Sequence, residues 1–131
     1  MKNQDPSPLR QELSQLLKEL EDLTALFKRK SPLWKGTVYT LRRKCGRPNC
    51  RCAKGELHET TVLSDRSGRQ SRTIPLKGND VNRFRSITQR YRRVRTARAR
   101  VATISKRILA IIDQLTEIRL EEGHEKHKKR K

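Results

Sequence analysis

Residues 82–112 read NRFRSITQRYRRVRTARARVATISKRILAII. Nine arginines and one lysine occur in this stretch without one acidic residue, while apolar side chains recur every three or four positions. The apolar spacing predicts one long helix, which we extend over residues 80–122 with Asp80 as its cap and Gly123 as its stop. Like charges one helical turn apart oppose folding. The missing negative charge is therefore expected from a partner, and nucleic-acid phosphate is the best candidate.

A second helix is predicted upstream, over residues 8–28. Ser7-Pro8 is typical of a helix start. The apolar residues that follow have spacings of four and three, which form a heptad seam: Leu9, Leu13, Leu16, Leu20, Leu23 and Phe27. If the two helices pack antiparallel, this seam places Phe27 near Phe84 and Leu9 near Val101 or Ile104.

The distal part of the long helix would then have no partner within this chain. An exposed seam of branched apolar residues favours burial by another molecule. We therefore expect a homo-oligomer or a larger protein partner, with an oligomer interface at Ile104, Ile108, Ile111, Leu115 and Ile118.

The region between the helices has β character. Residues 37–41, 60–63 and 71–74 are short runs rich in β-branched residues, and 65–68 has the composition of a turn. The fold predicted is mainly α with a small β insertion: two long helices, as an antiparallel helical hairpin or coiled coil, flank a β-hairpin knob resembling a zinc knuckle. The corresponding segments are an N-terminal heptad helix (1–30), a Cys/His knob (31–79), an Arg-rich helix (80–122) and a basic disordered tail (123–131).

Three cysteines and one histidine gather in the knob with the spacing C-x4-C-x-C-x5-H: Cys45, Cys50, Cys52 and His58. Three thiols and one imidazole make a complete tetrahedral ligand set for structural zinc. Zinc binding would also contribute folding free energy to a chain whose apolar content is only 32%. Reduced structural or incidental cysteines are the alternative interpretation, and a catalytic thiol is the weakest, because no third orienting group is evident.

The motif at residues 45–58, together with Ser67-Gly68-Arg69 and Tyr91-Arg92-Arg93, resembles a family of small uncharacterised prokaryotic proteins. In that family a Cys-Gly-basic-Pro-x-Cys-x-Cys-Ala-x-Gly-x-x-His stretch precedes a hairpin and a basic helix. Some members are encoded near transposases, so the resemblance implies a link to a mobile element. This chain has Glu59-Thr60-Thr61 where the family usually continues with Gly-Pro-Tyr.

The formal net charge of +19 indicates a polyanionic partner. We expect DNA rather than RNA, and neither a membrane nor a small-molecule substrate. No apolar run approaches the roughly 20 residues of a membrane span. Three clustered cysteines do not suggest a disulfide framework, so a cytoplasmic, reducing compartment is expected.

The sequence predicts a non-enzymatic accessory protein, because it contains no phosphate-binding glycine loop, catalytic triad or H-E-x-x-H motif. Its alternatives are an adaptor that docks on a larger enzyme such as a recombinase, and an RNA-binding protein. Basic side chains of the knob and the long helix are the candidate nucleic-acid contacts: Arg42, Arg43, Lys44, Arg47, Arg51, Arg83, Arg85, Arg90, Arg92, Arg93, Arg95, Arg98, Arg100 and Arg107.

Overall fold

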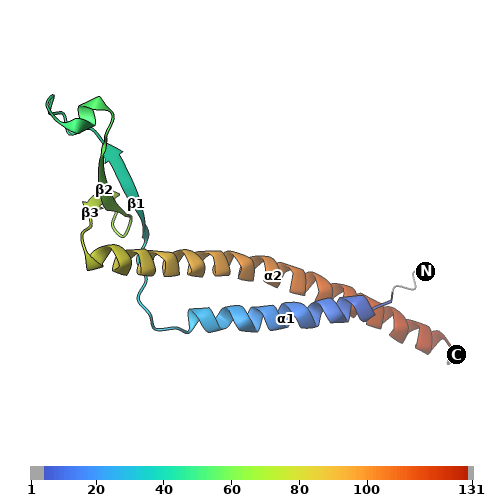
Figure 1. Ribbon diagram of the computed structural model, residues 1–131. Coiled ribbons are helices and arrows are strands. Elements are labelled where there is room, and N and C mark those ends of the chain that lie inside the picture. The colour runs from blue at the N-terminus through green and yellow to red at the C-terminus, as the bar shows by residue number, and fades with distance from the viewer. Residues whose placement is uncertain (1–4, 130–131) are drawn as a thin grey trace. The chain divides into compact units, whose positions relative to one another are not determined.

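The computed structural model describes residues 5–129 (Figure 1). It contains two helices with a small three-stranded antiparallel sheet between them in the chain, and it is mainly helical, as the sequence predicted. The chain divides into two compact units, which are described separately. The first unit comprises Met1–Arg29 and Thr96–Lys131, and the second comprises Lys30–Arg95.

Helix α1 spans Ser7–Phe27, within one residue of the prediction at each end. Pro8 lies in its first turn, where the missing N–H costs no hydrogen bond. The predicted cap is wrong in detail: the cap position is Pro6, and the side chain that accepts a hydrogen bond there is Asp5, whose Oδ1 lies 3.0 Å from the backbone N of Ser7. The acidic side chain suits the positive end of the helix dipole.

Helix α2 spans Asn79–Lys129 and is longer than predicted. Asp80 lies in its first turn, one residue inside the helix rather than at the cap. Gly123 does not stop the helix, because it does not adopt the positive φ that a C-terminal glycine requires. The helix-favouring residues Glu121, Glu122 and Glu125 around it offset the roughly 1 kcal/mol that a helical glycine costs. Residues 123–129, which the sequence analysis assigns to the basic tail, thus lie within α2, and residues 130–131 lie outside the described part.

Within the first unit, α1 runs antiparallel to the C-terminal part of α2. Two bidentate ion pairs join the helices: Glu12 with Arg107 at 2.6 and 2.7 Å, and Glu19 with Arg100 at 2.6 and 2.8 Å. Advancing seven residues along α1 thus corresponds to retreating seven along α2. Continuing this register places Leu9 level with Ala110 and Ile111, about two turns beyond the predicted level of Val101 or Ile104.

The packing of this unit corrects the predicted unpartnered seam. Ile104, Ile108 and Ile111 are buried within the chain, with Ile111 fully inaccessible, and Leu9 of α1 is buried as well. The shifted register is the reason, because it brings α1 onto a part of α2 that was expected to extend beyond it. Two other residues of the predicted interface, Leu115 and Ile118, are half-buried.

The second unit holds a sheet with strand order β1-β2-β3. Strand β1 spans Gly36–Arg43, β2 spans His58–Asp65 and β3 spans Arg72–Pro75. The β1–β2 ladder runs from the pair Gly36–Asp65 to the pair Arg43–His58. Gly36 is required at its end of the ladder, because a Cβ there would lie 2.5 Å from the backbone oxygen of Ser64.

The sheet packs on the first turns of α2, which belong to the same unit. Val62, Leu63 and Leu76 are buried. The ring of Trp34 meets that of Phe84 edge-on with centroids 5.3 Å apart, and the backbone N–H of Trp34 donates to the carbonyl oxygen of Ile87 at 3.2 Å. These contacts fix the Gly36–Asp65 end of the sheet against α2, while the Arg43–His58 end carries the loop with the cysteines.

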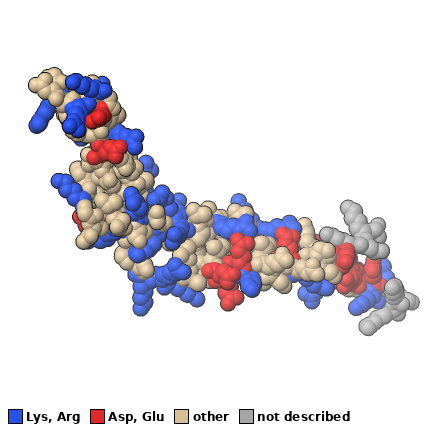
Figure 2. All heavy atoms as spheres, viewed as in Figure 1, with Lys and Arg blue, Asp and Glu red and all other residues tan. Residues whose placement is uncertain are grey.

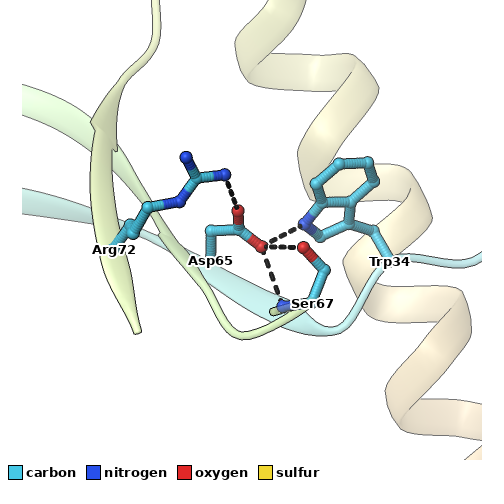
Figure 3. Close-up of polar contacts among 4 residues, drawn as sticks. All are labelled: Trp34, Asp65, Ser67 and Arg72. Atoms are coloured by element: carbon cyan, nitrogen blue, oxygen red, sulfur yellow. Dashed lines mark hydrogen bonds and ion pairs between the residues drawn. The ribbon is translucent and has the colours of Figure 1, made fainter. Parts of the chain in front are cut away.

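Asp65 is a buried carboxylate at the fixed end of the sheet (Figure 3). Its Oδ1 accepts hydrogen bonds from the backbone N–H of Ser67 at 2.9 Å, the Ser67 hydroxyl at 2.6 Å and Nε1 of Trp34 at 3.1 Å. Its Oδ2 pairs with the Arg72 guanidinium at 3.1 Å. Such complete pairing compensates for burying the charge. The sequence had indicated only a turn residue here.

Candidate metal centre and basic surface

The cysteine cluster is built by the loop that joins β1 to β2. Cys45 follows the end of β1, and His58 is the first residue of β2. Between them, the backbone N–H of Cys50 donates to Arg47 O at 3.2 Å, and a 3-10 turn, η1, spans Arg51–Lys54. Gly55 ends this turn with φ near 116°, a conformation that glycine adopts without steric cost.

The loop brings the four predicted ligands together. One donor atom from each of Cys45, Cys50, Cys52 and His58 lies within 4.8 Å of all the others. Sγ of Cys52 is 3.4 Å from Sγ of Cys45, and Sγ of Cys50 is 3.1 Å from Nε2 of His58. Donors around a tetrahedral zinc ion lie roughly 3.5–3.8 Å apart, given metal–ligand distances of about 2.0–2.3 Å. The residues present therefore fit zinc in both chemistry and spacing.

The thiols are free rather than paired as a disulfide. Cys52 is buried and its Sγ also accepts a hydrogen bond from the backbone N–H of Cys45 at 3.2 Å, whereas Cys45 and His58 are exposed. The pKa of Cys50 is lowered to about 6 by the backbone N–H of Cys52, with further stabilisation of its thiolate by the Cys45 and Cys52 thiols. For Cys45 the backbone N–H of Arg47 favours the thiolate, but the neighbouring thiols and desolvation outweigh it and raise the pKa.

An open pocket of about 740 Å³ adjoins this cluster. Its walls include Cys45, Cys50 and His58 together with three cationic side chains, Arg43, Lys44 and Arg47. Lys and Arg side chains also gather on this part of the molecule in the space-filling view (Figure 2). The acidic residue on the wall, Glu59, is paired with Arg42 at 3.0 Å.

Several of the predicted nucleic-acid contacts are engaged within the chain. Arg100 and Arg107 are neutralised by glutamates of α1, so the expectation that the arginines of residues 82–112 lack any counter-charge in the chain is wrong for these two. Arg42 pairs with Glu59, and Arg90 donates to the carbonyl oxygen of Pro32 at 3.4 Å. The Arg83 guanidinium lies over the Phe84 ring, 5.3 Å from its centroid.

The other predicted contacts form a distinct class. Each is exposed and has no ion pair among the described residues: Arg43, Lys44, Arg47, Arg51, Arg85, Arg92, Arg93, Arg95 and Arg98. In the second unit, the half-buried apolar and aromatic side chains of α2 are Val81, Phe84, Ile87, Tyr91 and Val94. At about 100° per residue, Arg85, Arg92 and Arg93 flank or oppose that packed face, and Arg95 is exposed at the last residue of the unit. We call these four residues the α2 arginine face.

Sequence reasoning missed the two glutamates that neutralise arginines. Glu12 and Glu19 are seven residues apart beside the leucine seam of α1, and Arg100 and Arg107 have the same separation on α2. Matching seven-residue repeats of opposite charge next to apolar seams are the signal of cross-helix pairing. That signal is present in the sequence.

Residues 7–80, more than half of the chain, match the family described as Domain of unknown function (DUF6788). The chain belongs to this family. The DUF6788 region contains α1, the sheet and all four cluster residues, and it ends at the first turn of α2. The α2 arginine face therefore lies outside the DUF6788 match.

No curated protein matches the chain, and no solved structure matches it. Within residues 5–129, neither helix has a stretch that is both long and apolar enough to cross a bilayer.

Proposed function

We propose that this protein binds nucleic acid, with DNA preferred over RNA, and that one structural zinc ion at Cys45, Cys50, Cys52 and His58 stabilises its second unit. The observation that carries the nucleic-acid proposal is the α2 arginine face: four exposed guanidinium groups within eleven residues, with no carboxylate partner among the described residues. Arginine presents a planar fork of donors that matches phosphate oxygens bidentately.

The internal pairing of Arg100 and Arg107 sharpens this proposal. Where α1 supplies glutamates, the arginines of α2 are paired at 2.6 Å. The arginines of residues 85–95 have no glutamate of α1 as a partner. Their mutual repulsion is therefore reduced only when a polyanion binds. We therefore assign the contact with phosphates to residues 85–95 rather than to the whole stretch 82–112.

The zinc proposal is supported by the donor set and by the small apolar core of the second unit. Zinc bound there would supply folding free energy and no catalytic chemistry, because three thiolates and one imidazole fill all four tetrahedral positions. The chain's own residues would hold the loop: Cys45 anchors it to the end of β1, His58 anchors it to the start of β2, and the buried Cys52 fixes the turn between them.

The protein would act as a non-enzymatic accessory factor, and the resemblance to proteins encoded near transposases supports a role with a mobile element. Self-association belongs to the same proposal. Its surface is not the buried isoleucines but the large apolar side chains that α2 leaves exposed in the first unit, Leu109, Ile112 and Leu120. The same exposed side chains favour the second candidate, an adaptor that docks on a larger enzyme.

The test is binding of fluorescein-labelled 20-base-pair duplex DNA, a single strand of the same length and a structured RNA hairpin, each from 50 to 400 mM salt. Phosphate contacts predict that log affinity for duplex DNA falls linearly with log salt, with a slope of several units. Equal or tighter binding to the hairpin would mean that the protein does not prefer DNA over RNA, and the proposed target would then be RNA. No binding to any of the three at the lowest salt would refute the proposal and leave the adaptor.

A further inference from the structure

We propose, building on the nucleic-acid binding above, that the pocket beside the Cys/His cluster is a second contact, which holds backbone phosphate through Arg43, Lys44 and Arg47, and that the metal centre positions it. All three side chains line the same pocket of about 740 Å³. That volume accommodates a nucleotide-sized segment of backbone. We call these three residues the pocket cations.

The strand register determines which cations face the pocket. Arg43 pairs with His58 and Arg42 pairs with Glu59 in the β1–β2 ladder. Directly paired residues project to the same face of a sheet, and successive residues project to opposite faces. Arg43 and His58 therefore share one face, and Arg42 and Glu59 share the other. Arg43 and His58 both line the pocket. Glu59 also reaches the pocket wall, but Arg42 does not, and its guanidinium is paired with Glu59 at 3.0 Å.

The charge of the pocket favours an anion even with zinc in place. A zinc ion bound by three thiolates and a neutral imidazole carries one net negative charge. The pocket cations exceed that charge, and the Glu59 carboxylate on the wall is already paired with Arg42. Among the described residues, none of the pocket cations has an ion-pair partner of its own.

The loop makes the pocket dependent on the metal centre. Lys44 immediately precedes Cys45 in the chain, and Arg47 lies between the two ligands Cys45 and Cys50. The loop contains only one regular element, the four-residue turn η1. Binding of a metal ion by Cys45 and Cys50 would fix the backbone on both sides of Arg47. Without the metal, we expect the position of Arg47 relative to Arg43 to be less restricted.

The experiment compares three full-length proteins on the same labelled duplex DNA across the salt series: wild type, Arg43→Gln/Lys44→Gln/Arg47→Gln, and Arg119→Gln/Lys126→Gln/Lys128→Gln. The last variant removes the same charge from exposed positions on α2, away from the pocket in the chain, and controls for net charge. The pocket variant should reduce the salt slope by about two to three units, since each phosphate contact contributes about 0.9. The control should leave the slope within about one unit of wild type.

The metal link is tested by repeating the titrations after chelation with and without added Zn²⁺. Chelation should weaken DNA binding by wild type and have little further effect on the pocket variant, because the two changes remove the same contacts. Fluorescence of Trp34, the single tryptophan, reports whether the sheet stays packed on α2. Equal loss on chelation in both proteins with unchanged Trp34 fluorescence would refute the coupling.

The outcomes separate this inference from the proposed function. If the pocket variant keeps the wild-type slope while replacement of the α2 arginine face lowers it, the pocket is not a contact and nucleic-acid binding stands. If wild type does not bind nucleic acid, both fail together. If the pocket variant loses only a response to inorganic phosphate in ³¹P NMR, the site takes small anions and the assignment to backbone phosphate is wrong.

Discussion

Nε1 of Trp34 donates a hydrogen bond over 3.1 Å to Oδ1 of Asp65, which lies 31 residues further along the chain. The same indole packs edge-on against Phe84 of α2. The Trp34 side chain thus connects the end of strand β2 to the helix, while the Asp65 carboxylate also binds Ser67 of the turn and Arg72 of β3 (Figure 3). This contact is one of those that hold the sheet in place within the second unit.

Replacing Asp65 should therefore destabilise the second unit. Asp65→Asn keeps the volume but loses the charge that pairs with Arg72, and its amide nitrogen cannot accept a hydrogen bond. We expect the Tm to fall by roughly 5–10 °C and the Trp34 emission to shift to longer wavelength. Glu59→Gln, which breaks the exposed ion pair with Arg42, is the control and should change Tm by no more than about 2 °C. Equal effects of the two variants would show that Asp65 has no structural role.

The same carboxylate predicts how stability depends on pH. The pKa of Asp65 is lowered to about 2, first by the Ser67 hydroxyl and then by the Ser67 backbone N–H, with Arg72 and Trp34 contributing further. Because the folded pKa lies below the unfolded value of about 3.9, the stabilisation is complete above about pH 4 and is lost as the pH falls towards 2. Urea unfolding of wild type and Asp65→Asn at pH 2, 3, 4 and 6 should give a stability difference that shrinks below pH 4. A constant difference would contradict the lowered pKa.

The regular elements follow from local patterns in the sequence, but the helix register does not. A heptad seam repeats every seven residues, so sliding one helix along the other by a repeat preserves most apolar contacts. The choice depends on long-range packing. The first turns of α2 carry Trp34 on Phe84 and Ile87, and only residues from Thr96 onward share a unit with α1. The sequence alone does not reveal this division of α2.

The candidate site shows the same contrast. The four cluster residues were predictable because a metal centre imposes ligand type and short loop spacing, both of which are visible in the sequence. The different roles of Arg42 and Arg43 could not be predicted, because the two residues are adjacent in sequence and identical in chemistry. The strand register separates them, since it pairs Arg42 with Glu59 and Arg43 with His58.

The metal centre predicts a defined stoichiometry. Protein purified without added metal under reducing conditions should contain about one zinc per chain by elemental analysis. Cys50→Ser should lose the zinc and lower the Tm of the protein, since the folding free energy that the metal supplies is then lost. His124→Ala, a histidine outside the cluster, is the control and should retain full occupancy. If native protein contains no stoichiometric metal, the zinc proposal is wrong and the cysteines are incidental.

The burial of Ile111 predicts where the first unit obtains its stability. Ile111→Ala should lower the free energy of unfolding by about 2–4 kcal/mol, because the side chain is fully buried within the chain. Leu17→Ala, at an exposed position of α1 in the same unit, is the control and should cost less than about 1 kcal/mol. Both measurements should be repeated over a hundredfold range of protein concentration. If the cost at Ile111 rises with concentration, the side chain is buried by self-association and the register inferred from the ion pairs is wrong.

The two classes of arginine on α2 should respond oppositely to substitution. Replacing Arg85, Arg92, Arg93 and Arg95 with Gln should lower the salt slope of DNA binding by about three to four units, while helicity and Tm stay close to wild type. Arg100→Gln/Arg107→Gln removes the ion pairs with Glu19 and Glu12, so it should lower Tm by a few degrees and leave the salt slope nearly unchanged. Circular dichroism and fluorescence anisotropy on the same samples measure both effects. The second variant could instead lose as much DNA affinity as the first. In that case Arg100 and Arg107 would contact DNA despite their ion pairs with α1, and the contact would extend along the whole basic stretch.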